Sequence, residues 1–251
     1  MLPVSVIAVP YHQDEYLPDL DFPLEPAQVV TARITEEDPW GRLAAPCAAV
    51  AHAVAADVRR GGRPVVLTGD CCTSLGVVAG LHGAGIDPGI VWFDAHGDVQ
   101  TPQTSAGGYL GGMPLRLLTG YQPELIATRL GLLPVPEERI VLAGARDLDP
   151  PERDYLAGAR IRRREVAGLT TADLPEGPLY VHVDLDVIDA PAVPGLRYPV
   201  PDGPSPAQLA DTLGLILGTG RVAALTLACT WYPGHQAGAQ LSGYLQSILA
   251  A

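Results

Sequence analysis

The sequence predicts an α/β protein of three layers, in which a mostly parallel sheet lies between two layers of helices. Short apolar runs alternate with longer stretches rich in Ala and Leu, the order expected of parallel strands joined by helices. Several apolar runs are continuous, as in strands that are covered on both faces. Hydrophobic residues make up 47% of the 251 residues and charged residues 18%, which is enough apolar material for a large core.

The predicted elements follow in order along the chain. Strands are predicted over residues 4–9, 64–68, 90–94, 140–143, 179–184 and 223–227. Helices are predicted over residues 44–60, 74–82, 114–118, 151–158, 205–217 and 236–249. Residues 14–38, rich in acids and prolines, are predicted to form an extended excursion at the entrance to a site. Because no repeat, linker or break in composition interrupts this order, we expect one domain over residues 1–251.

Charge and motifs exclude several classes of protein. The net charge of −12 disfavours nucleic acids and anionic membranes as partners. The chain has no apolar run long enough to span a bilayer and no basic N-terminal segment of a secretory signal. Its four cysteines lack the spacing of a disulfide scaffold or zinc ribbon, and it has no phosphate-binding loop or nucleophile elbow. These features predict a cytoplasmic protein that binds neither nucleic acid nor membranes.

Two segments rich in carboxylates lie at the ends of predicted strands. Residues 94–98 read Asp-Ala-His-Gly-Asp, and residues 184–186 read Asp-Leu-Asp. Ligands of open parallel sheets bind at the carboxyl ends of the strands, so we expect the four carboxylates and one imidazole to converge. One such Asp is usually a cap or turn former, but gathered carboxylates repel one another unless a cation binds. This set suits divalent ions such as Mn²⁺, and two rather than one.

Five segments resemble motifs of the arginase/agmatinase (ureohydrolase) family, in the family's order. Residues 92–98 with 101–102 resemble its DAHxD segment, and residues 182–189 resemble its SxDxDxxDP segment. Residues 199–203 resemble its PVPGG stretch, residues 144–150 resemble its GxRDxDP segment, and residues 68–71 stand where the family has GGDH. The resemblance implies an arginase-like fold and a metal-dependent amidinohydrolase.

The resemblance also implies a centre of two Mn²⁺ ions. Asp94 and Asp184 would bridge the ions, Asp98 would bind the first, and His96 and Asp186 would bind the second. A bridging water, activated to hydroxide, would attack the carbon of a guanidine-type group. Asp98 would then carry the proton to the leaving amine.

Three further residues fall at substrate-contacting positions of the family. Asp149 corresponds to a residue that contacts the α-amino group of the substrate, and Gln100 and Ser105 lie near the positions that contact its α-carboxylate. The resemblance further implies a homo-oligomer as the assembled form.

The first departure from the family pattern is Cys71, which stands where the family has a histidine ligand. A thiolate can bind a metal ion, but it is softer than imidazole and carries a negative charge. Cys71 is therefore a candidate ligand that would admit Zn²⁺ or Fe²⁺ in place of Mn²⁺. The alternatives are a buried apolar Cys beside a centre that has lost a ligand, or a nucleophile, which the nearby carboxylates disfavour.

Two more departures concern the substrate pocket. Gly111 stands where many arginases place a proton-relaying histidine, and the glycine pair could make room for a bulkier substrate group. Thr230, with Cys229 beside it, stands where the family has a glutamate that holds the guanidinium cation. A neutral hydroxyl cannot form that charge-assisted pair, and a cation left unpaired in a dry pocket is costly. We therefore expect L-arginine to be a poor substrate.

His182 occupies a usual serine position of the family, on the same face of its strand as Asp184. It is a candidate catalytic residue, either as a hydrogen-bond donor to the ligands or as a substitute base. A packed histidine bonded to a backbone carbonyl is the alternative. His235 is a weaker candidate for a base in the pocket.

The leading functional hypothesis is hydrolysis of a modified guanidine such as Nω-hydroxy-L-arginine, giving ornithine and hydroxyurea. A branch of the family linked to antibiotic biosynthesis resembles this chain in its Cys and its GYLGGM-type loop. N-hydroxylation lowers the basicity of a guanidine, so a neutral substrate would tolerate Thr230. Two alternatives remain: a binding protein that keeps the fold without hydrolase activity, and a metal hydrolase of a formimino or ureido group. Two bound Mn²⁺ per chain would favour an enzyme.

Overall fold

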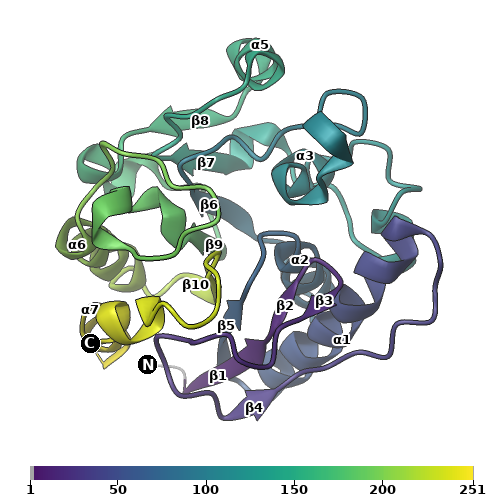
Figure 1. Cartoon of the computed structure of the whole chain (residues 1–251), viewed down its shortest axis with the longest axis horizontal. Coiled ribbons are helices and arrows are strands. Elements are labelled where there is room, and N and C mark those ends of the chain that lie inside the picture. Colours follow the sequence, from purple (N-terminus) through teal and green to yellow (C-terminus); the bar gives the residue numbers. More distant parts are fainter. Residues whose placement is uncertain (1–2, 251) are drawn as a thin grey trace.

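An eight-stranded sheet forms the centre of the protein (Figure 1). In this computed structural model, which describes residues 3–250, all neighbouring strands of the sheet are parallel. The order is β4-β1-β5-β10-β9-β6-β7-β8. The strands are β1 (Val4–Val9), β4 (Gln28–Val29), β5 (Arg63–Thr68), β6 (Gly89–Phe93), β7 (Ile140–Ala143), β8 (Arg162–Arg164), β9 (Leu179–Asp184) and β10 (Val222–Ala228). The predicted three-layer α/β fold is confirmed, while residues 1, 2 and 251 of the predicted domain lie outside the described part.

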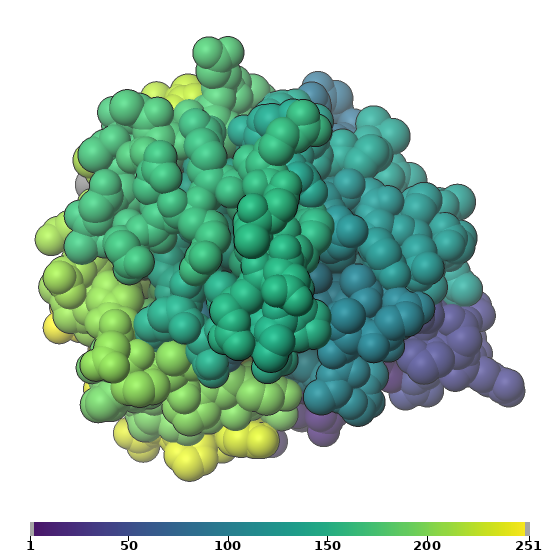
Figure 2. Space-filling model, turned by 90° about the horizontal axis from the view of Figure 1, so that it is seen from above, coloured from purple at the N-terminus to yellow at the C-terminus, as the bar shows by residue number. Residues whose placement is uncertain are grey.

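Helices cover both faces of this sheet. One face packs against α1 (Pro39–Arg59), α2 (Thr73–Gly83), α3 (Pro114–Leu118) and α4 (Ala127–Leu130), and the other against α6 (Pro206–Leu217) and α7 (Ala237–Ala250). Helix α5 (Pro150–Gly158) lies beyond β8 at the edge of the sheet (Figure 1). Short 3₁₀ helices are η1 (Ala106–Gly108), η2 (Leu110–Gly112), η3 (Glu137–Arg139), η4 (Val166–Gly168), η5 (Thr171–Asp173), η6 (Leu185–Val187) and η7 (Ala190–Ala192). Figure 2 looks onto the α5 and β8 side, where green residues from the middle of the chain form the surface.

Alternation along the strands divides the core between the two faces. On β6, Ile90 and Trp92 pack with the helices of the α1 face, whereas Val91 and Phe93 pack with those of the α6 face. All four side chains are fully buried. Burying an apolar side chain of this size stabilises the fold by roughly 1.5–3 kcal/mol, so both helix layers are held to the sheet by the same strands.

Element boundaries differ from prediction where capping decides them. Helix α1 begins at Pro39 rather than at residue 44, because the Asp38 side chain accepts a hydrogen bond from the Gly41 amide (2.8 Å) and Pro39 fits the first turn. The short edge strands β4 and β8 were not predicted, since neither has a buried apolar pattern. The excursion over residues 14–38 contains β4 and one strand of the hairpin β2 (Tyr11–His12) and β3 (Glu15–Tyr16).

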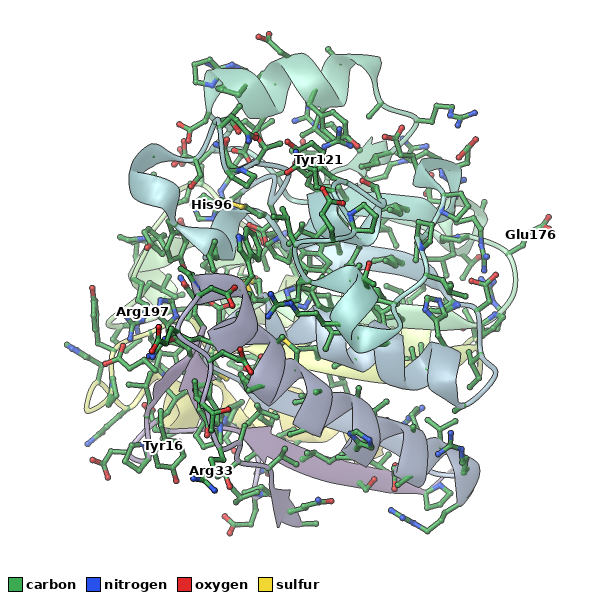
Figure 3. All side chains as sticks on the ribbon, turned by 90° about the vertical axis from the view of Figure 1, so that its right-hand side faces the viewer. Tyr16, Arg33, His96, Tyr121, Glu176 and Arg197 are labelled. Carbon is green, nitrogen blue, oxygen red and sulfur yellow. The ribbon has the colours of Figure 1, made fainter. Side chains whose placement is uncertain are left out.

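The strand order gathers four strand ends at one edge of the sheet. Strands β5 and β6 are joined through α2, yet β10 and β9 lie between them. Such a switch in strand order opens a crevice at the carboxyl ends. In Figure 3, His96, which follows β6, and Arg197 lie toward one end of the molecule, opposite Glu176, which precedes β9. Within residues 3–250, no helix has the length and apolarity needed to cross a membrane.

Candidate metal centre

A cavity of about 300 Å³ opens at these four strand ends. It receives side chains from the segments after β5 and β6, from the end of β9 and η6, and from the segment after β10. Most of the residues singled out in the sequence line it, namely Cys71, His96, Asp98, Gln100, Ser105, Asp149, Asp184, Asp186 and Thr230. Asp94 lies among them and is almost completely buried.

One group of donors is centred on His96. Its Nδ1 lies 3.2 Å from Asp94 Oδ1 and 3.2 Å from Asp186 Oδ2. Asp94 is fixed by the His96 amide (2.7 Å) and by Trp92 Nε1 (3.1 Å), both of which donate to it. Although burial opposes a charge on His96, its two carboxylate partners raise the pKa of His96 to about 12.

A second group lies around Cys71. His182 Nε2 is 3.3 Å from Cys71 Sγ, and the thiol donates to Asp184 Oδ2 at 2.9 Å. The His182 ring stacks on Trp92, with centroids 3.7 Å apart. Its Nδ1 lies 3.4 Å from the hydroxyl of Tyr180. Burial lowers the pKa of His182 to about 3, so this imidazole is neutral.

Asp184 joins the two groups through its hydrogen bonds. Its Oδ1 accepts from the Asp186 amide at 2.9 Å and from Thr230 Oγ1 at 2.6 Å. The hydroxyl proton of Thr230 is therefore committed to this carboxylate. With the Cys71 thiol on Oδ2, both oxygens of Asp184 are bound by groups from neighbouring strand ends.

The gathered carboxylates destabilise one another. Burial, together with neighbouring carboxylate charges, raises the pKa values of Asp98 and Asp184 well above the usual range and that of Asp186 to about 6. Asp94 differs, because hydrogen bonds from His96 outweigh its burial and lower its pKa. A divalent cation would relieve this repulsion.

The donor atoms fit such a cation. Two sets of three potential ligands, Asp94–His96–Asp186 and Cys71–Asp94–His182, each have their donor atoms within 4.8 Å of one another, and Asp94 belongs to both. Asp98 Oδ2 is buried and has no hydrogen-bond partner among the described residues. Asp98 also has φ of +54°, a conformation uncommon outside glycine and often kept at functional sites. A buried carboxylate oxygen without a hydrogen-bond donor is suited to bind a metal ion or a proton.

Further polar side chains line the cavity. Gln100 Nε2 donates to Asp149 Oδ2 at 2.9 Å, and Ser105 donates to the Tyr109 carbonyl at 2.8 Å. Glu152, which the sequence analysis missed, is buried here and accepts from the Asp149 amide at 3.1 Å. The Asp-x-x-Glu capping box of α5 could have revealed it.

Three candidates lie outside the cavity. Cys229 packs in the core of the α6 face, because it points to the opposite side from its neighbour Thr230. His182 is fully buried and lies two residues before Asp184 on β9, beneath the cavity rather than in its wall. His235 is exposed and packs against Gly195.

Arg146 and two tyrosines were not assigned roles from the sequence. The Arg146 guanidinium donates to carbonyls at both ends of the loop between β9 and α6, including Val187 at 3.0 Å and Val200 at 2.9 Å. Tyr198 of this loop and Tyr109 both line the cavity. One side chain, Arg146, therefore holds together the two ends of the loop that follows Asp186.

Sequence comparisons place these features among known proteins. The sequence model of the arginase family matches residues 4–229. An Nω-hydroxy-L-arginine amidinohydrolase from Streptomyces lavendulae is 32% identical over 165 residues, which are 64% of this chain and 58% of that protein. An arginase from Bacillus caldovelox is 36% identical over 168 residues, 61% of this chain and 56% of that protein. The matched region thus spans little more than half of either relative.

Solved structures share the fold over nearly the whole chain. Arginase from Bacillus cereus superposes with a TM-score of 0.82 over 99% of both chains at 22% identity. Formimidoylglutamase from Bacillus subtilis superposes with a TM-score of 0.74 over 100% of this chain and 87% of the other, at 15% identity. At these identities the likeness supports the fold alone.

Proposed function

The chain belongs to the arginase family, and from this premise we propose that it is a metal-dependent hydrolase of a guanidine-type C–N bond. The proposed substrate is a weakly basic, N-hydroxylated guanidine such as Nω-hydroxy-L-arginine, hydrolysed to ornithine and hydroxyurea. The observation that carries the choice is the 2.6 Å hydrogen bond from Thr230 to Asp184. We also propose a cytoplasmic location, which the four free, buried cysteines favour.

Two divalent ions, Mn²⁺ or the softer Zn²⁺ or Fe²⁺, would supply Lewis acidity and an activated water. One ion is assigned to the His96 group and the other to the carboxylates on the Cys71 side. The proposed ligands are Asp94, Asp184, His96 and Asp186 for the one, and Asp94, Asp184, Cys71 and Asp98 for the other. The mixed thiol and carboxylate set on the second side favours a softer ion there than Mn²⁺.

We assign the transfer of protons during the reaction to Asp98. Asp98 lines the cavity with Oδ2 free of hydrogen bonds, which suits it to take a proton from the attacking water and pass it to the leaving amine. His182 does not line the cavity but lies 3.3 Å from Cys71. We therefore assign His182 a positioning role, exerted through Cys71, rather than direct contact with the substrate.

Thr230 selects the charge state of the substrate. A guanidinium cation needs an anionic partner in a pocket shielded from water. Thr230 is neutral, and its proton is already donated to Asp184. A neutral hydroxyguanidine has no charge to pair, so the site accommodates it better than L-arginine. Gln100, Ser105 and Asp149 also line the cavity and are the proposed partners of the amino-acid tail.

The test combines metal analysis with paired assays. Protein loaded with Mn²⁺, Zn²⁺ or, without oxygen, Fe²⁺ is supplied with Nω-hydroxy-L-arginine or L-arginine, and hydroxyurea or urea is measured. Because an unpaired cation costs a few kcal/mol, we expect kcat/KM to be at least about a hundredfold higher for the hydroxylated substrate. Elemental analysis should find metal bound to the active form.

Other results would point elsewhere. Equal or reversed preference between the two substrates would contradict the assigned role of Thr230. Hydrolysis of a formimino amino acid, with neither guanidine consumed, would show that the substrate carries a formimino group rather than a guanidine. Protein that binds no divalent ion and hydrolyses none of these compounds would support the binding-protein alternative.

A further inference from the structure

The cavity wall at position 111 is built by another residue. Gly111 is buried and lines the cavity. A Cβ added at this glycine would lie 2.3 Å from Cζ and from the hydroxyl oxygen of Tyr109. Such distances are far inside van der Waals contact, so the space that a side chain at 111 would enter is filled by the Tyr109 ring. The room that the sequence predicted for a bulkier substrate is therefore absent.

The Tyr109 ring contacts two further aromatic rings. It stacks on His12 of the β2–β3 hairpin, with centroids 6.0 Å apart and planes at 25°. The centroid of Tyr198 is 5.3 Å from that of Tyr109, and Tyr198 in turn meets His96 edge-on at 6.1 Å. These ring contacts reach from the N-terminal hairpin to the metal-ligand group.

The backbone on both sides of Tyr109 is fixed. The Tyr109 carbonyl accepts from Ser105 at 2.8 Å, and the Gly112 carbonyl accepts from the Gln100 amide at 2.9 Å. Burial and the charge of Asp70 raise the pKa of the Tyr109 phenol far above its ordinary value. Tyr109 thus lines the cavity with a neutral phenol, whose hydroxyl end lies over Gly111.

We propose that Tyr109 is a specificity-determining residue, whose phenol donates a hydrogen bond to the head group of the substrate. This inference rests on the proposed function. It states that the site recognises hydrogen-bond acceptors on the head group of the substrate. A guanidinium cation carries only donors, as the side chain of arginine does. A neutral hydroxyguanidine adds acceptors, the oxygen and the imine nitrogen lone pair. A fixed phenol donor discriminates between the two, while the ring limits the pocket to a flat group.

The first experiment replaces Tyr109 by Phe in metal-loaded protein. The ring stays, so the wall, the metal content and the melting temperature should be unchanged. Loss of one hydrogen bond should reduce the preference for Nω-hydroxy-L-arginine over L-arginine, measured as the ratio of kcat/KM values, by about tenfold. An unchanged ratio would overturn the proposal, since a purely structural tyrosine would not move it.

The second experiment tests whether the Tyr109 ring occupies the space next to Gly111. It compares substitutions at two neighbouring glycines. Gly111→Ala should weaken substrate binding strongly, because its Cβ collides with the Tyr109 ring. Gly112→Ala is the matched variant, with its nearest neighbour, Gln100 Cγ, at 3.5 Å, and should have a much smaller effect. In a Tyr109→Ala background, Gly111→Ala should cost little. Equal effects of the two glycine changes, or no relief in that background, would show that Tyr109 does not hold this space.

Calorimetric binding separates this inference from the proposed function. Nω-hydroxy-L-arginine titrated into metal-loaded protein should bind about tenfold more weakly to Tyr109→Phe than to the parent. If the parent binds this ligand without hydrolysing it, the proposed reaction fails while the role of Tyr109 is still measured. If both proteins bind equally well, the role of Tyr109 fails whatever the reaction.

Discussion

The His96 side of the cavity and the Cys71 side share Asp94 but are built from different chemistry. The His96 side holds an imidazole and carboxylates, all hard or borderline donors. The Cys71 side holds a thiol, and its imidazole comes from His182 on β9. Each side therefore has one imidazole. On the Cys71 side it comes from β9, whereas the position after β5 where the family has a histidine holds Cys71. Because these two side chains touch, we expect the residues at 71 and 182 to be coupled.

The largest expected effect comes from Asp94, which is proposed to bind both ions. Asp94→Asn should remove a ligand from both sites, whereas Asp186→Asn should affect the His96 side alone. We expect the Asp94 variant to lose both ions and, with several kcal/mol of metal stabilisation gone, on the order of a thousandfold in kcat/KM. Asp186→Asn should retain one ion.

Elemental analysis and hydroxyurea release measure both variants of this pair. Asp147→Asn is a suitable control, because this exposed carboxylate lies outside the cavity. Equal metal loss in the Asp94 and Asp186 variants would mean that the two sides do not divide the ions as proposed.

The second prediction tests whether positions 71 and 182 are coupled. Cys71→His alone would place a second imidazole against His182, whose Nε2 is already 3.3 Å from the sulfur. Overpacking of this kind costs about 1–3 kcal/mol, so we expect a lower melting temperature and poor metal binding. Cys71→His combined with His182→Ser should recover stability, bind Mn²⁺ more fully and raise activity toward L-arginine.

A double-mutant cycle over unfolding free energies and Mn²⁺ content measures this coupling. Additive effects of the two substitutions would contradict the expected coupling, because the two positions would then act independently.

The smallest predicted effect concerns the hydroxyl on Asp184. Thr230→Val keeps the volume but removes the 2.6 Å hydrogen bond to that carboxylate. Groups that orient a metal ligand typically contribute about ten- to a hundredfold to activity, and we expect the lower end, since the Asp186 amide still binds the same oxygen.

Thr212→Val is the matched control for this loss of a hydroxyl. Thr212 on α6 is also buried and donates to the Gln208 carbonyl at 3.0 Å and to the Val166 carbonyl at 3.3 Å, outside the cavity. The substitution should cost about 1 kcal/mol of stability, seen in denaturant unfolding, with less effect on kcat/KM. A larger loss of activity in Thr212→Val than in Thr230→Val would argue against a special role for the hydroxyl on Asp184.

The parts of the site that the sequence predicts are those next to strand ends. Asp94, Asp184 and Thr230 follow or end continuous apolar runs, and a parallel sheet brings such ends to one edge. Cys229 was named together with Thr230, but it packs in the core of the α6 face. Alternation could have separated the two, since neighbouring residues of an extended segment face opposite sides.

Other parts of the site depend on packing between distant segments. Tyr109 occupies the space at Gly111 because a loop of 3₁₀ turns folds it back over its own chain. His12 reaches Tyr109 only through the N-terminal hairpin. Neither contact leaves a periodic or spacing signal. The edge strands β4 and β8 were missed for a similar reason, since their pairing partners rather than their own composition make them strands.

The guanidinium of Arg146 has a consequence for how the rim of the cavity responds to a ligand. By donating to carbonyls at the start and the end of the loop between β9 and α6, it ties Asp186 and Tyr198 to one anchor. These hydrogen bonds hold the loop in the folded protein before a ligand arrives. Binding should therefore cost little conformational entropy for ordering the rim of the cavity. Sequence changes in the middle of the loop can then accumulate without displacing the carboxylate at its base.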